Sequence, residues 1–166
     1  MNSINLAVIP GDGIGPEIVE STIQIFETLG SPFAWEVQQA GVAGVEALGD
    51  PLPAQTLESI RKNHLALKGP LTTPVGEGFT SINVTLRKKF NLYSNVRPVI
   101  SFKGTKARYE NIDIITVREN TEGMYSGAGQ VVKNEGELAE AMSIVTREGS
   151  ARIVEFAFEL ARRENR

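Results

Sequence analysis

The order of apolar segments constrains the fold of this chain more than any other feature. Residues Ile4–Pro10 form a short, mostly apolar run that is typical of a strand buried on both faces. A glycine-containing turn follows, and Pro16 suits the first turn of a helix because an N–H group there would have no helical partner. Apolar residues at helical spacing then continue toward Gly30, where we expect the helix to end.

The alternation continues through the next eighty residues or so. We expect strands at Ala34–Ala40, in the first half of LALKGPLTTP and at Ile112–Val117, the last of them buried. We expect helices over PAQTLESIRKN and over SINVTLRKKF, with Ser81 as the N-cap of the second. Strands that alternate with helices predict an α/β fold with a parallel-rich sheet and flanking helices.

The pattern changes after about residue 123. A hairpin is predicted around Asn134–Gly136, with a second arm that fits either a strand or a helix. Ser150 is the expected cap of a final helix, ARIVEFAFELARREN, whose apolar residues lie around nearly its whole circumference. Such a helix must be covered by other protein, so we expect either further chain or a partner subunit against it.

Composition excludes several classes of protein. With 166 residues, 41% of them hydrophobic and 22% charged, the chain can build one ordinary core of a soluble globular protein. Its lack of cysteine excludes disulfide bonds and cysteine-ligated zinc. No apolar run reaches the ~18 residues of a membrane span, and the N-terminus lacks the pattern of a targeting segment. We therefore expect a cytoplasmic protein with no membrane partner.

Positive charge is concentrated in one part of the chain. The net charge is −3, yet residues 81–109 contain seven Lys or Arg and no acid, so the other residues must sum to −10. A solvated basic face would be the ordinary interpretation of such a segment. Here polar residues are interleaved with the bases, which favours a field focused on an anion.

Five polar side chains in and after this segment form a candidate carboxylate or phosphate site. Asn83 and Arg87 are four residues apart and share a helix face, and Ser81 lies at the helix N-terminus, which attracts anions. Arg97 precedes a proline and is expected to be extended, and Arg118 follows a predicted strand at its ligand-binding end. Three arginines from separate elements can clamp a small polycarboxylate, although one alone is more often a surface ion-pair partner worth ~0–1 kcal/mol.

A tyrosine follows the last of these arginines. Tyr125 lies seven residues after Arg118, in RENTEGMYSG. Neighbouring cations favour the phenolate form of a tyrosine, which suits this side chain to donate or accept a proton. The alternative is a packed tyrosine with a solvated hydroxyl group.

Three long motifs, in order, carry a family resemblance. IPGDGIGPE, KGPLTTPVGEGFTSINVTLRKKFNLYSNVRP and RENTEGMYSG together resemble isocitrate dehydrogenases, most closely the NAD-dependent kind. These enzymes belong to the β-decarboxylating dehydrogenase family, with isopropylmalate and homoisocitrate dehydrogenases. The likeness covers essentially the whole chain. The pattern of Ser81, Asn83 and Arg87 is similar to the motif of isocitrate dehydrogenases, whereas isopropylmalate dehydrogenases carry apolar residues in that region.

The resemblance implies a site and a reaction. The implied isocitrate-binding residues are Ser81, Asn83, Arg87, Arg97 and Arg118. Tyr125 would protonate the carbon that loses carbon dioxide, and Thr72 and Thr73 would lie between substrate and nicotinamide. The implied activity is oxidative decarboxylation of isocitrate to 2-oxoglutarate in the tricarboxylic acid cycle. NAD would be the cofactor, with NADP as the alternative, and Mg²⁺ or Mn²⁺ would stabilise the enolate.

The resemblance also implies an incomplete isocitrate/isopropylmalate dehydrogenase-like α/β fold. In the family, the catalytic lysine, the aspartate metal ligands and the adenosine-binding loop follow the part that this chain matches. The chain would therefore supply no metal ligand and be inactive alone. The implied organisation is a large-domain segment (1–92), part of a small domain (93–122) and a clasp-like dimerisation segment (123–166). A homodimer is expected, because the lysine and one aspartate come from the neighbouring subunit in family dimers.

Other features of the sequence fit different interpretations. Gly11, Gly13 and Gly15 precede a proline where the dinucleotide-binding fingerprint needs glycine, so we interpret them as turn and packing residues. His64 has no partner at metal-ligand spacing and is expected at the surface or a helix end. Aromatic residues among the bases of 81–109 also fit a nucleic-acid-binding module, but the net negative charge opposes it. A non-catalytic or regulatory subunit with a tricarboxylate site is the remaining alternative.

Overall fold

The chain forms two compact units. A computed structural model describes residues 3–72 and 81–166, and the units comprise residues 1–83 and 84–166. The boundary between them falls inside the helix α4 (Ile82–Lys89), which is the predicted SINVTLRKKF helix. The domain limits predicted at residues 92 and 122 stay predictions.

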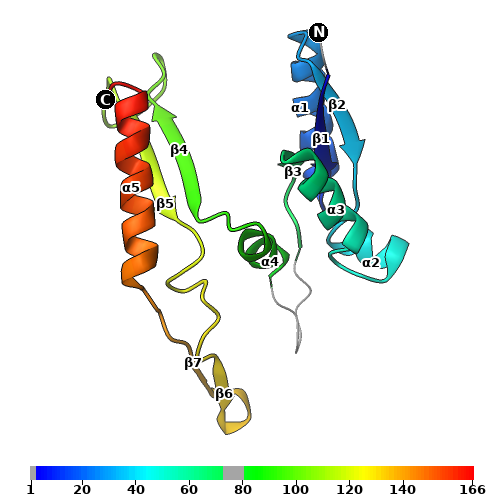
Figure 1. The fold of residues 1–166 in the computed structure, drawn as a ribbon, viewed down its shortest axis with the longest axis vertical. Helices are drawn as coiled ribbons and strands as arrows, with labels where there is room; N and C mark the ends of the chain where they lie inside the picture. Colours follow the sequence, from blue (N-terminus) through cyan, green and yellow to red (C-terminus); the bar gives the residue numbers. More distant parts are fainter. Residues whose placement is uncertain (1–2, 73–80) are drawn as a thin grey trace. The chain divides into compact units, whose positions relative to one another are not determined.

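The first unit contains a three-stranded parallel sheet (Figure 1). Its strands are β1 (Ile4–Ile9), β2 (Phe33–Val37) and β3 (Ala66–Lys68), in the order β2-β1-β3. The central strand supplies much of the core, because the last three residues of β1 are almost completely buried. The three strands and the parallel sheet predicted for this region are confirmed.

Helices accompany this sheet in the first unit. α1 (Gly15–Thr28) has the expected proline in its first turn, and Gly30 follows it with φ of +69°. α2 (Val42–Leu48) is a short helix that the sequence pattern did not predict, whereas α3 (Ala54–Asn63) is the predicted PAQTLESIRKN helix. His64 is exposed and ends α3 in the left-handed conformation, as expected of a helix-end residue.

The glycine turn between β1 and α1 packs closely against the segment that follows β3. A Cβ atom at Gly11 would lie 2.1 Å from the carbonyl oxygen of Pro70, and the φ of +84° at Gly11 favours glycine. A Cβ atom at Gly15 would lie 2.4 Å from the carbonyl oxygen of Pro10. These glycines are turn and packing residues, as predicted.

The second unit is built on an antiparallel pair of strands, β4 (Ser94–Ile100) and β5 (Asp113–Glu119). The long helix α5 (Arg147–Arg163) lies along β5 (Figure 1). A hairpin of β6 (Val131–Lys133) and β7 (Leu138–Glu140) precedes α5, joined by the turn predicted there. The predicted hairpin is confirmed, and its second arm is a strand.

Three expectations for the second unit are wrong. β5 is antiparallel to β4 and its residues are exposed or half-buried, because α5 covers only one face of this two-stranded sheet. Arg118 lies inside β5, opposite Asn95, rather than after the strand. Ser150 lies inside α5, because Oγ1 of Thr146 accepts a hydrogen bond from the N–H of Gly149 at 2.9 Å and is the actual N-cap.

No helix among the described residues is long and apolar enough to cross a membrane.

Candidate active site

Arg118 and Tyr125 form the centre of the candidate site. Nη2 of Arg118 donates a hydrogen bond to the hydroxyl oxygen of Tyr125 at 2.6 Å, and Cζ of Arg118 lies 5.2 Å from the centre of the tyrosine ring. Cζ of Arg87 lies 5.7 Å from the same ring centre. All three residues are half-buried. Two guanidinium groups therefore lie around one phenol, within the distance at which a cation is attracted to an aromatic face.

Local contacts of the chain explain why these groups meet. Tyr125 follows β5 in a turn in which its N–H donates to the carbonyl oxygen of Glu122 at 3.3 Å. The carbonyl oxygen of the next residue, Ser126, accepts a hydrogen bond from Nζ of Lys88 at 2.8 Å. Because Lys88 follows Arg87 on α4, this bond holds the helix against the turn that carries the tyrosine.

Arg97 lies on the same face of the β4–β5 sheet as Arg118. In the antiparallel register, Asn95 is opposite Arg118 and Thr116 is opposite Arg97, so these four side chains share a face. Arg97 is exposed, and its Nε donates to Oδ1 of Asn95 at 3.3 Å. Diagonal neighbours in such a pair are about 7–8 Å apart, which allows two arginine side chains to reach one small ligand.

The other predicted substrate-binding residues lie at the start of α4. Ser81 directly precedes the helix, and Asn83 lies one turn before Arg87. Asn83 and Arg87 are both half-buried. The structure thus brings Arg87, Arg118 and Tyr125 together, and the catalytic or substrate-binding roles of all six predicted residues stay predictions.

The residues predicted to meet the cofactor lie beyond β3. The backbone N–H of Thr72 donates to Oδ2 of Asp12 at 2.7 Å, and the N–H of Val42 donates to Oδ1 of Asp12 at 2.9 Å. Asp12 therefore joins the start of α2 to the segment after β3. Thr73 lies outside the described residues, and the cofactor-binding roles of Thr72 and Thr73 stay predictions.

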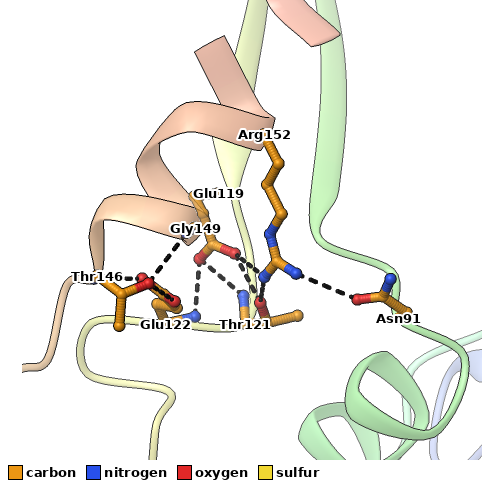
Figure 2. A network of polar contacts seen from close by, with 7 residues as sticks. All are labelled: Asn91, Glu119, Thr121, Glu122, Thr146, Gly149 and Arg152. Atoms are coloured by element: carbon orange, nitrogen blue, oxygen red, sulfur yellow. Dashed lines mark hydrogen bonds and ion pairs between the residues drawn. The ribbon is translucent and has the colours of Figure 1, made fainter. Parts of the chain in front are cut away.

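A network of polar contacts joins the end of β5 to α5 (Figure 2). The carboxylate of Glu119 accepts hydrogen bonds from the Thr121 hydroxyl at 2.6 Å, from the N–H groups of Thr121 and Glu122 at 2.8 and 2.7 Å, and from Arg152 at 3.3 Å. Burial by itself raises the pKa of Glu119, but these hydrogen bonds outweigh it and hold the pKa below its ordinary value. A charged, well-bonded group therefore follows Arg118 directly in sequence.

A second carboxylate fixes the N-terminus of α5. Glu122 accepts hydrogen bonds from the hydroxyl and the N–H of Thr146 at 2.6 and 2.8 Å, and these bonds lower its pKa. A Cβ atom at Gly149 would lie 2.3 Å from the carboxyl carbon of Glu122, so α5 approaches this carboxylate closely. The sequence prediction missed this arrangement, although threonine is a preferred N-cap residue.

The arrangement suits acid–base chemistry on an anionic substrate. A phenol has one O–H donor and also accepts hydrogen bonds at its oxygen. Because Arg118 donates to the oxygen of Tyr125, the phenolic proton is free to be given to another atom. Guanidinium groups such as those of Arg87 and Arg118 also bind carboxylates through paired N–H donors. An α/β fold that gathers these groups is suited to hold a small anion beside a proton donor.

Comparisons with known proteins identify the family. Residues 5–166 match the family described as isocitrate/isopropylmalate dehydrogenase, and the chain belongs to this family. The predicted family and fold are thereby confirmed.

The individual relatives are named for different substrates and cofactors. The chain is 47% identical to the mitochondrial NAD isocitrate dehydrogenase catalytic subunit 5 of Arabidopsis thaliana, covering 98% of this chain and 43% of the relative. It is 46% identical to the chloroplastic 3-isopropylmalate dehydrogenase of Solanum tuberosum, covering 99% and 46%. It is also 46% identical to the NADP isocitrate dehydrogenase of Thermus thermophilus, covering 97% and 33%.

A solved structure agrees with these relatives. The crystal structure of isocitrate dehydrogenase from Methylococcus capsulatus matches with a TM-score of 0.89 and 50% identity, over 100% of this chain and 49% of that chain. This chain therefore spans less than half the length of each of the proteins to which it is similar here.

Proposed function

We propose that this chain provides the substrate-binding part of an NAD-dependent isocitrate dehydrogenase, which converts isocitrate to 2-oxoglutarate by oxidative decarboxylation. The observation that carries the proposal is the hydrogen bond between Arg118 and Tyr125, with Arg87 facing the same ring. This arrangement combines fixed positive charges for carboxylates with a proton donor. Decarboxylation of a β-keto acid that bears several carboxylates needs both.

Each polar group has a role in this proposal. Five side chains bind the carboxylates and hydroxyl of isocitrate: Ser81, Asn83, Arg87, Arg97 and Arg118. In the complete enzyme the secondary alcohol of isocitrate would give a hydride to NAD and its hydroxyl proton to a general base, which leaves a β-keto acid. The bond to the β-carboxylate then breaks, carbon dioxide leaves, and the electron pair left on carbon takes the proton of Tyr125. The tyrosine becomes a phenolate, which the hydrogen bond from Arg118 stabilises.

The surface of α4 favours isocitrate over isopropylmalate as the substrate. Isopropylmalate has an isopropyl group where isocitrate has a carboxymethyl group. Asn83 and Arg87 are half-buried one turn apart, and an apolar group against them would leave polar donors unpaired, at about 1–3 kcal/mol for each. Overall identity does not separate the two substrates, since relatives of both names are 46 to 47% identical to this chain.

NAD is the proposed hydride acceptor, and Mg²⁺ or Mn²⁺ the proposed ion. When bound, the cofactor accepts the hydride and the ion acts as a Lewis acid at the enolate oxygen. Residues 3–72 and 81–166 contain no group of three or more His, Cys, Asp or Glu side chains that could hold a metal ion. The choice of NAD rests on the resemblance of the motifs to the NAD-dependent kind, because a relative named for NADP is almost equally similar.

A homo-oligomer is part of the proposal. Val154 and Phe158 lie four residues apart on one face of α5, with 51% and 73% of their surfaces exposed. Large apolar side chains gathered on one helix face are usually covered by other protein. A second copy of the chain, or further chain of the same enzyme, would cover this face.

A chimaeric enzyme tests the proposed function. Residues 1–166 would replace the matched 49% of the Methylococcus capsulatus isocitrate dehydrogenase. Reduction of NAD would be followed with isocitrate and Mn²⁺, and then with isopropylmalate and with NADP. We expect isocitrate to be turned over at least about 10²-fold more efficiently than isopropylmalate, because polar donors that are left unpaired discriminate against an apolar analogue.

Other outcomes contradict parts of the proposal. Preferential turnover of isopropylmalate would refute the substrate. A folded chimaera that binds isocitrate but reduces neither cofactor would favour the non-catalytic or regulatory subunit. The 166-residue chain alone is expected to be inactive, and turnover by it would contradict the expected dependence on residues outside this chain.

A further inference from the structure

Arg152 of α5 contacts residues from two other parts of the second unit (Figure 2). Its Nη2 donates a hydrogen bond to the hydroxyl of Thr121 at 2.7 Å and to Oε1 of Glu119 at 3.3 Å. Its Nη1 donates to Oδ1 of Asn91 at 3.4 Å. Its Cζ lies 4.8 Å from the centre of the Tyr93 ring. One guanidinium group thus connects α5, the end of β5 and the segment between α4 and β4.

These contacts lie next to the candidate site along the chain. Glu119 directly follows Arg118, the arginine that donates to Tyr125. Asn91 lies two residues after the end of α4, the helix that carries Arg87. Arg152 therefore contacts the segment that follows α4 and the last residue of β5, and its own described hydrogen bonds go to neither the two site arginines nor the tyrosine.

We propose that Arg152 is a positioning residue, which holds α4 and the end of β5 in one arrangement so that Arg87 and Arg118 face Tyr125. The inference rests on the proposed function, because it takes these three side chains to be the ones that meet the substrate. It adds a role for a residue on α5 whose described polar and ring contacts include neither the tyrosine nor either site arginine.

The surroundings of Arg152 favour this role over that of an ordinary surface ion pair. The side chains of Arg152 and Glu119 are only 30% and 20% exposed, so solvent screens their interaction less than that of a surface pair. A planar guanidinium has donors in fixed directions, so one nitrogen donates to Asn91 and the other to Glu119 while Cζ lies over the Tyr93 ring. A lysine ammonium group lacks this geometry.

The aromatic surface under Arg152 is itself fixed by neighbours. The Tyr93 ring packs edge-on against Phe156 of α5, with ring centres 6.2 Å apart. The carbonyl oxygen of Tyr93 accepts a hydrogen bond from the N–H of Asn120 at 2.9 Å, and Asn120 directly follows β5. The guanidinium therefore stacks on a ring that α5 and the end of β5 already hold in place.

Carbon-13 NMR of the tyrosine rings tests the inference without any substrate. The chain has three tyrosines, so labelling at Cζ gives three resonances, which Tyr→Phe variants assign. Arg152→Met keeps most of the side-chain length and removes the donors. We expect the Tyr125 resonance to shift by more than its linewidth, because the contacts that hold Arg118 against the phenol loosen. Tyr93 touches Arg152 and should shift in any case, whereas Tyr109, in an exposed loop, should not.

Two further variants keep the test decisive. Arg163→Met removes an arginine from the same helix at an exposed position, and it should leave the Tyr125 resonance in place. Asn91→Gly removes only one acceptor of Arg152 and suits the φ of +50° at that position. Asn91→Gly should shift the Tyr125 resonance in the same direction as Arg152→Met does, by a smaller amount. If Arg152→Met does not fold, Asn91→Gly tests the inference in its place.

Isocitrate binding to the 166-residue chain provides a second readout. Calorimetry should show the Kd for isocitrate rising about tenfold in Arg152→Met, the effect of a modest loss of binding free energy, and staying unchanged in Arg163→Met. A shift confined to Tyr93 would overturn the inference, whatever happens to isocitrate. A shifted Tyr125 in a chain that never binds isocitrate would contradict the proposed function and leave the positioning role intact.

Discussion

The chemistry proposed for Tyr125 depends on the positive charges beside its oxygen and its ring. When the phenol gives up its proton, negative charge develops on the oxygen to which Arg118 already donates a hydrogen bond, and Cζ of Arg87 lies 5.7 Å from the ring centre. Donors that are already oriented stabilise such charge without further reorganisation. The sequence placed Arg118 and Tyr125 seven residues apart, and the structure turns this short separation into direct contact.

Replacing the proposed proton donor should affect the rate more than binding. In the chimaeric enzyme, Tyr125→Phe removes the hydroxyl, and we expect kcat to fall by about 10²–10⁴-fold, the usual contribution of a positioned proton donor. The KM for isocitrate should change little, because both arginines remain. Steady-state kinetics measure this, with Tyr109→Phe, a change in an exposed loop, as the control. An unchanged kcat in Tyr125→Phe would assign the proton transfer to another group.

Glu122 predicts how stability depends on pH. Hydrogen bonds from Thr146 lower its pKa from the ordinary 4.5, so the folded chain holds the charged form more strongly than the unfolded chain does. This stability is fully present above pH 4.5 and is lost as the pH falls through the lowered pKa of the folded state. Thermal unfolding between about pH 6 and pH 3 should show a shallower decline of Tm in Glu122→Gln than in the unchanged chain.

A matched substitution on α5 separates this effect from general acid unfolding. Glu159 is exposed and has no described hydrogen bond or ion pair, so Glu159→Gln should retain the full decline of Tm. Equal declines in the unchanged chain and in Glu122→Gln would show that the bonds to Thr146 do not contribute to acid sensitivity.

At the scale of elements, a side chain from another segment determines the residue at which α5 begins. The Glu122 carboxylate holds Thr146, and the Thr146 hydroxyl caps the helix through Gly149. The predicted cap, Ser150, has the right residue type, but the carboxylate that fixes the true cap lies 24 residues before Thr146. The local sequence pattern therefore predicted the helix, and the contact between Glu122 and Thr146 determined the residue at which it starts.

Gly149 allows two opposing effects to be compared. Alanine in a helix interior is about 1 kcal/mol more favourable than glycine, so Gly149→Ala would stabilise α5 if helix propensity were the only effect. A Cβ atom there would lie 2.3 Å from the Glu122 carboxyl carbon and displace that carboxylate from Thr146. We expect the loss of these bonds to outweigh the helix propensity, so that Gly149→Ala lowers the urea concentration at the midpoint of unfolding. Ser150→Ala, at the next position, is the control and should change stability by less than about 0.5 kcal/mol.

The strands show which features of the sheets can be predicted from the pattern of apolar residues and which cannot. β1 was predictable because its apolar residues are nearly contiguous, and its last three residues, which alternate between the two faces, are almost completely buried. β4 was not predicted as a strand beyond the extended conformation of Arg97, because its apolar residues are interrupted by Arg97 and a proline and it contains no buried residue. β5 was predicted, but its exposed face could not be, since burial depends on what packs against a strand.

In the first unit of the molecule, one carboxylate joins segments that are far apart in sequence. Asp12 accepts hydrogen bonds from the N–H groups of Val42, Ala43 and Thr72, and so connects the glycine turn, the start of α2 and the segment after β3. The sequence prediction treated this turn only through its glycines. The aspartate between them supplies the contact that organises the surroundings.

Removing this carboxylate should destabilise the unit that contains it. Asp12→Ala leaves the three N–H groups without their acceptor, and we expect a loss of about 1–3 kcal/mol in the free energy of unfolding, measured by urea titration. Asp50→Ala is the control, because Asp50 accepts a single described hydrogen bond, from Leu52, at an exposed position. Equal effects of the two substitutions would contradict the joining role of Asp12.

The sequence by itself determined the alternation of strands and helices, the position of the hairpin, the family and the residue types of the candidate site. These follow from local periodicity, turn residues and long contiguous motifs, all of which are properties of neighbouring residues. Only the tertiary structure decided that Glu122 holds the Thr146 cap of α5, that Asp12 joins the glycine turn to Thr72 and that Arg152 reaches Asn91. Those contacts span 24, 60 and 61 residues, and no local pattern records which distant groups will meet.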